Sequence, residues 1–94
     1  MSDPTKWQFR HFPMEALEPI CRALQEGSEK YGYRNWEYEL QPRDLVDAMM
    51  RHLKEASETG IDPETGIHHA AYMAANAIII CAMLYNGPFK GTKL

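Results

Sequence analysis

The chain has 94 residues, of which 45% are hydrophobic and 24% are charged, and its formal net charge is −3 with histidine neutral. This balance argues against a general nucleic-acid-binding protein, which is usually basic. No apolar signal segment opens the sequence, and no apolar run is long enough to span a bilayer. We therefore expect a soluble, cytoplasmic protein with no membrane or nucleic-acid partner. Its single domain would span residues 1–94, with the core in residues 14–86 and loose termini.

The first helix is predicted from about residue 14 to residue 30. Apolar and small side chains recur there at steps of three and four residues, which places them on one face of a helix. They are Leu17, Ile20, Cys21, Leu24 and Ser28. Pro13 is acceptable at a helix start.

The second helix is predicted from about residue 42 to residue 59. Its apolar stripe consists of Leu45, Ala48, Met49, His52, Leu53 and Ala56. Pro42 suits the first turn, and Asp44 favours the positive end of the helix dipole. Gly60 then supplies a stop signal.

The third helix is predicted from about residue 67 to residue 86, and it is apolar nearly all round. Such a helix is buried on most of its sides. Two other short helices offer little cover, because a chain of this length buries only about 60% of its unfolded surface. An all-α bundle of three main helices, completed by homo-oligomerisation, is therefore expected. Three consecutive isoleucines leave a strand over residues 77–82 as the alternative.

The two cysteines, Cys21 and Cys81, lie within the first and third helical patterns. A free cysteine behaves as a small hydrophobic residue, so both are expected to be buried free thiols. Their spacing makes neither a metal motif nor a disulfide framework.

Three polar residues lie on otherwise apolar helix faces. His52 falls in the stripe of the second helix, and His69 and Asn76 are seven residues apart on the third. A separation of seven residues is two helical turns, so His69 and Asn76 point the same way. Buried polar groups need hydrogen-bond partners. The three either pair with one another and with loop backbone, or line a binding pocket.

Two carboxylate pairs have the spacing of neighbours on a helix surface. Glu26 and Glu29 form the first pair, and Asp44 and Asp47 form the second. Facing carboxylates supply the oxygen ligands that Mg²⁺ prefers and leave positions for water and phosphate. The alternative is that both pairs belong to solvated helix surfaces.

Two loops carry a mixture of residue types that helix periodicity does not explain. The segment EKYGYRNW combines cations, aromatic rings and an amide, a set that suits a nucleotide pocket. Its candidates are Lys30, Tyr31, Arg34, Asn35 and Trp36. The alternative is a loop held to the core by its aromatic rings. In the turn DPETG, Asp62 either caps the turn or reaches a metal or the basic residues Arg51 and His52.

Taken in chain order, these motifs resemble one known family. They are Lys30-Tyr31-Gly32, Arg34-Asn35-Trp36, Arg43, Asp47-Ala48, Arg51-His52, Asp62 to Gly66, His69 and Asn76. The series is similar to the small phage and prophage dATP/dGTP diphosphohydrolases, grouped near the all-α NTP pyrophosphatases of the MazG type. The resemblance covers residues 14–86, and for a phage-encoded protein it implies the host cytoplasm.

The resemblance implies Mg²⁺-dependent hydrolysis of a purine deoxynucleoside triphosphate to the monophosphate and pyrophosphate. MazG-type enzymes carry E-x-x-E and then E-x-x-D, and here Glu26-x-x-Glu29 and Asp44-x-x-Asp47 take those places. Asp44 stands where that pattern has Glu, and Gly27 lies inside the first pair.

The same resemblance suggests roles for individual residues. Glu26, Glu29, Asp44 and Asp47 would hold Mg²⁺, with Glu29 and Asp47 as the catalytic carboxylates. Lys30, Arg34 and Arg51 would offset phosphate charge, and Tyr31 or Trp36 would stack on the base. Asn35, His52, Asp62, His69 and Asn76 would complete one hollow around the nucleotide.

Two other functions remain open. The first is a non-catalytic protein that binds or sequesters a nucleotide or a nucleotide-derived signal. The second is a helical interaction module whose third helix is a dimer interface. Release of pyrophosphate from a nucleotide would distinguish the enzyme from both.

Overall fold

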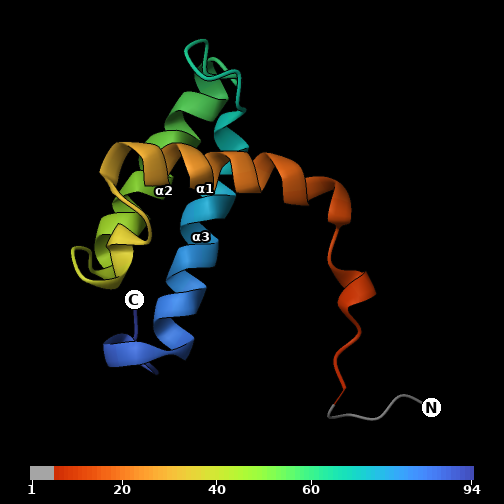
Figure 1. Cartoon of the computed structure of the whole chain (residues 1–94). Coiled ribbons are helices and arrows are strands. Elements are labelled where there is room, and N and C mark those ends of the chain that lie inside the picture. The colour runs from red at the N-terminus through yellow and green to blue at the C-terminus, as the bar shows by residue number, and fades with distance from the viewer. Residues whose placement is uncertain (1–5) are drawn as a thin grey trace.

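The computed structural model describes residues 6–94, which fold as three α-helices joined by loops and short 3-10 turns (Figure 1). The helices are α1 (Leu17–Tyr31), α2 (Pro42–Glu58) and α3 (His69–Tyr85). The 3-10 turns are η1 (Phe9–His11), η2 (Met14–Ala16), η3 (Asn35–Glu37) and η4 (Gly87–Phe89). The bounds of the three α-helices agree with the predicted helices to within a few residues. The described residues contain one isolated β-bridge but no strand. The alternative of a strand at residues 77–82 is therefore wrong.

The α2 and α3 helices pack along one another, and α1 crosses this pair near the end where the loop of residues 59–68 joins them (Figure 1). The chain turns back in that loop through the bridge between Ile61 and His68. Close α2–α3 packing brings the second half of α2 next to the first half of α3.

Local capping explains where α2 and α3 begin. At the start of α2, Gln41 and Asp44 form a reciprocal capping box, and the Asp44 carboxylate accepts from the Gln41 backbone N–H at 2.8 Å. The His68 imidazole accepts from the Ala70 N–H at 2.9 Å and caps α3. Both caps satisfy backbone N–H groups that have no partner within the helix.

The core consists of two small apolar clusters, one at each end of α3. The first joins α1 to the start of α3 and contains Ile20, Ala23, Ile67, Ala71 and Ala75. The second joins α2 to the end of α3 and contains Leu45, Ile80 and Met83. Alanine at the first cluster allows the helices to approach closely.

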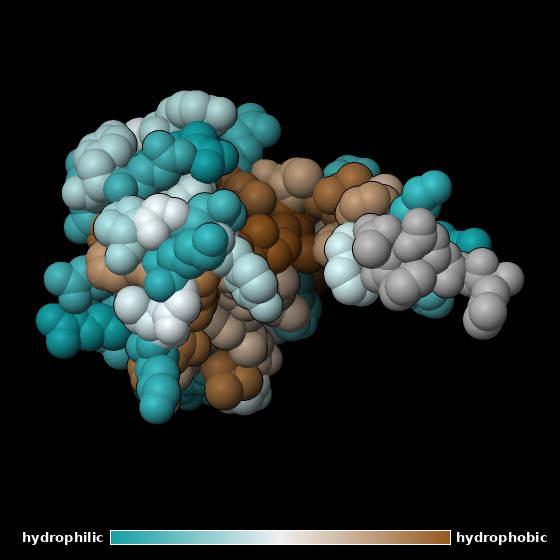
Figure 2. Space-filling view, turned by 90° about the horizontal axis from the view of Figure 1, so that it is seen from below, coloured by the Kyte–Doolittle hydropathy of each residue, from teal (hydrophilic) through white to brown (hydrophobic). Residues whose placement is uncertain are grey.

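Many large hydrophobic side chains remain at the surface of the single chain. They include Leu17, Met50, Leu53, Ile61 and Ile78, each at least 40% exposed. Figure 2 shows hydrophobic surface in the middle of the face seen from below. A second copy of the chain could cover these exposed hydrophobic side chains, and the predicted homo-oligomer stays a prediction. Among residues 6–94, no helix combines the length and hydrophobicity needed to cross a bilayer.

Two expectations for individual segments differ from the structure. Cys21 and Cys81 are free, as predicted, but both are exposed, because each falls beside the buried stripe of its helix. The C-terminal tail, expected to be loose, folds back: the Gly91 N–H donates to the Leu84 carbonyl at 2.9 Å, and Phe89 packs on the second cluster.

Candidate functional site

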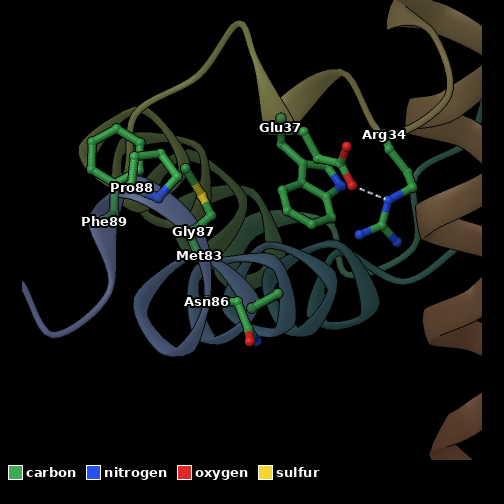
Figure 3. A pocket seen from close by; sticks show the side chains of 9 residues that line it. Arg34, Glu37, Met83, Asn86, Gly87, Pro88 and Phe89 are labelled. Atoms are coloured by element: carbon green, nitrogen blue, oxygen red, sulfur yellow. Dashed lines mark hydrogen bonds and ion pairs between the residues drawn. The ribbon is translucent and has the colours of Figure 1, made fainter.

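A cavity of about 350 Å³ lies where η3 and η4 meet the end of α3 (Figure 3). Its walls combine charged, aromatic and apolar groups. The lining residues with charged, amide, aromatic or large apolar side chains include Arg34, Trp36, Glu37, Met83, Asn86 and Phe89. Figure 3 shows Arg34 and Glu37 on one side and Pro88 and Phe89 on the other. A few polar groups in a mainly apolar hollow are typical of small-molecule sites.

Arg34 is the positively charged group that lines this η3–η4 cavity, and two neighbours hold it. Its guanidinium forms an ion pair with Glu37, and it lies 4.5 Å from the centroid of the Trp36 ring. The hydrogen bond from Arg34 to Glu37 raises the pKa of the guanidinium above its usual value. Arg34 therefore stays positively charged and is stacked on an aromatic face.

A second polar site lies at the opposite end of the helix pair, and it consists of His52, Glu55 and His69. The Nδ1 atoms of the two histidines lie 3.0 Å apart. Glu55 Oε2 lies 3.2 Å from the Nδ1 of His69 and 3.8 Å from the Nδ1 of His52. His69 is buried, His52 half-buried and Glu55 exposed, so this histidine–glutamate cluster opens to solvent on its Glu55 side.

Tyr72 connects the histidine–glutamate cluster to the DPETG turn. Its ring stacks on His52 with centroids 4.8 Å apart and planes 12° from parallel. The Tyr72 hydroxyl donates to Thr65 Oγ1 at 3.0 Å, and the Asn76 side chain donates to the Tyr72 carbonyl at 2.9 Å. His52 and His69 thus pair with one another and reach the DPETG turn through Tyr72, whereas Asn76 bonds the backbone of its own helix.

The environment of His52 favours its neutral form. Burial is the largest influence and lowers the pKa of His52. The nearby Glu55 carboxylate acts in the opposite direction, while His69 and Arg51 lower the pKa further. A neutral imidazole agrees with the short Nδ1–Nδ1 contact, in which one ring donates and the other accepts.

The four carboxylates predicted as Mg²⁺ ligands lie on helix surfaces with different partners. Glu26 pairs with Lys30 at 3.4 Å, and Glu29 accepts from Gln25 at 3.1 Å. Asp44 serves the capping box of α2. Asp47 is exposed and makes no hydrogen bond or ion pair with the rest of residues 6–94. Their role stays a prediction. Within that part of the chain, the potential ligand atoms that converge within 4.8 Å belong to the histidine–glutamate cluster instead.

The remaining candidates are exposed on the helices or serve the backbone. Lys30 and Tyr31 are exposed at the end of α1, and Arg51 is exposed on α2. Asn35 begins η3, where its carbonyl accepts from two later N–H groups. Asp62 Oδ1 accepts from the Glu64 N–H at 2.8 Å, which is the turn-capping arrangement considered from sequence.

One chain does not gather these residues around a single hollow. The histidine–glutamate cluster lies at the start of α3 and the η3–η4 cavity at its end. The helix is 17 residues long, which corresponds to about 25 Å. A single chain therefore does not form the expected shared hollow, because the packed α2–α3 pair separates its parts, and a hollow completed by a second subunit stays a prediction.

Among the residues with polar side chains at these sites, sequence reasoning missed Glu37, Glu55, Tyr72 and Asn86. Glu55 is three residues after His52, and Tyr72 is three residues after His69, so helical spacing was a usable signal for both. Glu37 is likewise three residues after Arg34. Asn86 had no local signal, because only the fold brings the end of α3 against the η3 loop.

Together these features define a small all-helical domain with one mixed polar and apolar cavity and one polar side-chain cluster. The family model for the dATP/dGTP diphosphohydrolase N-terminal domain matches residues 1–93. The chain belongs to this family. It is 40% identical over 82 residues to a protein of Salmonella phage PMBT28 named dATP/dGTP diphosphohydrolase. That alignment covers 81% of this chain and 28% of the phage protein. No solved structure matches the chain.

Proposed function

We propose that this chain hydrolyses purine deoxynucleoside triphosphates, dATP or dGTP, to the monophosphate and pyrophosphate with Mg²⁺. The observation that carries the proposal is the family match over residues 1–93, joined by the name of the phage relative. Since the chain spans 28% of that relative's length, the activity of the whole phage protein is part of what is proposed.

The η3–η4 cavity is the site we assign to the nucleotide. Its volume of about 350 Å³ is within the range of small-molecule pockets. Arg34 can offer a phosphate the guanidinium N–H groups other than Nε, which pairs with Glu37, and the Asn86 amide can donate to and accept from a base edge. Of the two rings predicted to stack on a base, Trp36 lines this cavity and could do so, with the Arg34 guanidinium over one of its faces, whereas Tyr31 is 67% exposed and does not line the cavity.

The donor chemistry of the carboxylates fits Mg²⁺. Proteins usually hold this ion through one or two carboxylates, while water and substrate phosphates complete the shell. Asp47 has no partner among residues 6–94 that would compete for its oxygens, and Glu29 shares one oxygen with Gln25. The bound ion would neutralise phosphate charge and lower the pKa of a water. A carboxylate left outside the metal shell would orient that water for attack.

The decisive measurement is product formation from each of the four deoxynucleoside triphosphates, with Mg²⁺ and with a chelator. Pyrophosphate and purine monophosphate in equal amounts, lost when the chelator is present, are expected. Inorganic phosphate with the diphosphate would instead indicate cleavage at the outer phosphate and would contradict the proposal.

The η3–η4 cavity also supports the second function, binding without hydrolysis. Thermal stabilisation by dATP or dGTP with no pyrophosphate released would favour that alternative. Arg34→Ala would then weaken the stabilisation, because the residue lines the cavity. Glu39→Gln, an exposed change in the same loop, is the matched control.

A further inference from the structure

We propose that His52, Glu55 and His69 form a binding site for a divalent transition metal ion, with Zn²⁺ as the best match. This site is separate from the Mg²⁺ carboxylates and does not depend on the proposed nucleotide hydrolysis. Its three ligand atoms come from two helices that the fold packs together.

The spacing of the three atoms suits one ion between them. Zn²⁺ binds histidine nitrogen and carboxylate oxygen at about 2.0–2.2 Å in tetrahedral geometry, which places neighbouring ligand atoms about 3.4 Å apart. The three separations here are 3.0, 3.2 and 3.8 Å. Their spread brackets the tetrahedral value, so the three atoms already lie close to the spacing that one ion requires. The longest separation involves Glu55, whose exposed side chain moves most easily.

The surroundings hold the ligands in place without closing the site. Tyr72 stacks on His52 and restricts its ring, and Thr65 fixes Tyr72. His69 is only 4% exposed, and its backbone N–H donates to the Gly60 carbonyl at 2.9 Å. Ligands fixed in this way lose little freedom on binding, while the open Glu55 side admits the ion.

The donor set also selects the kind of metal. Two imidazoles and one carboxylate suit Zn²⁺, Co²⁺ or Ni²⁺, whereas Mg²⁺ prefers an octahedral oxygen shell. In the present Nδ1–Nδ1 hydrogen bond one ring carries its proton on Nδ1. That ring would change tautomer on binding, moving the proton to Nε2, so that both Nδ1 lone pairs face the metal. Three protein ligands leave a fourth position for water.

The test is a titration of the full, metal-stripped chain with Co²⁺, followed by displacement with Zn²⁺. We expect one equivalent of Co²⁺ to give the intense visible absorption of tetrahedral Co²⁺, and Zn²⁺ to abolish it. Excess Mg²⁺ should leave the spectrum unchanged. Weak absorption of the kind given by hydrated Co²⁺, or bleaching by Mg²⁺, would overturn the proposal.

Matched variants locate the site. Glu55→Gln is expected to weaken Zn²⁺ binding by at least about tenfold, which is the scale seen when even supporting residues of metal sites are removed. Glu58→Gln removes the same charge one turn further along α2, where Glu58 pairs with Lys54, and should bind Zn²⁺ like the wild type. Both residues are exposed, so both variants should fold. Equal Zn²⁺ affinities for the two variants would overturn the assignment.

Discussion

The guanidinium of Arg34 lies 4.5 Å from the centroid of the Trp36 ring, although the two residues are separated by only one residue in the chain. This stacking depends on a left-handed backbone at Arg34, where φ is 51°. Among the described residues Arg34 is the one non-glycine residue with positive φ. Backbone strain in the η3 loop therefore coincides with the charged wall of the η3–η4 cavity.

Two substitutions of Arg34 separate the steric cost of its left-handed backbone from the stability contributed by its side-chain contacts. Arg34→Ala and Arg34→Gly both lose the ion pair and the stacking, but glycine adopts φ near 51° without the steric cost of a Cβ. We expect Arg34→Gly to be more stable than Arg34→Ala by about 1 kcal/mol. Urea unfolding of the two variants measures this difference, and an alanine variant as stable as the glycine variant would contradict it.

Two glycines are predicted to respond with opposite signs to the same substitution. Gly60 has φ of 74°, and a Cβ there would lie 3.3 Å from Nε2 of His68. Gly60→Ala should cost at least about 1 kcal/mol of unfolding free energy. Gly27 lies within α1 with open space around it, so Gly27→Ala should stabilise by about 0.5–1 kcal/mol. Thermal unfolding of the pair checks both signs together.

The lowered pKa of His52 predicts how the stability of the metal-free protein depends on pH. Burial keeps this pKa below its usual value of about 6.5, so between the two values the unfolded chain binds more protons than the folded one. The free energy of unfolding should therefore rise as pH increases through this window and level off above the ordinary pKa.

The measurement is urea unfolding of the wild type and of a His52→Gln variant between about pH 5 and 8, with a chelator present. His52→Gln removes the titrating group, and we expect the rise in unfolding free energy to become shallower. An unchanged slope in this variant would mean that another group is responsible.

Asp47→Asn tests the proposed catalytic role of the α2 surface. The substitution removes one negative charge and little volume from an exposed position, so helical circular dichroism should be preserved. Loss of at least about a hundredfold in pyrophosphate release is expected, because the residue is assigned to the metal and the attacking water. Glu39→Gln should retain activity, and full turnover by Asp47→Asn would remove that residue from the mechanism.

The identity and limits of the three helices were readable from the sequence alone. Apolar residues at steps of three and four residues, with Pro42 at one start and Gly60 after one end, report on each helix locally. The pairing of His52 with His69 was likewise among the alternatives, because a polar residue on an apolar face needs a partner.

Tertiary structure decided which of these residues meet. Periodicity places side chains on a helix face but contains no information on how two helices are oriented, so Glu55 and Tyr72 joined the histidines only once α2 packed on α3. The same packing put Arg34 and Trp36 at the far end of α3 and divided the expected hollow into two sites. The spacing of residues along the chain determined which segments are helices, and the packing of those helices determined which side chains meet at each site.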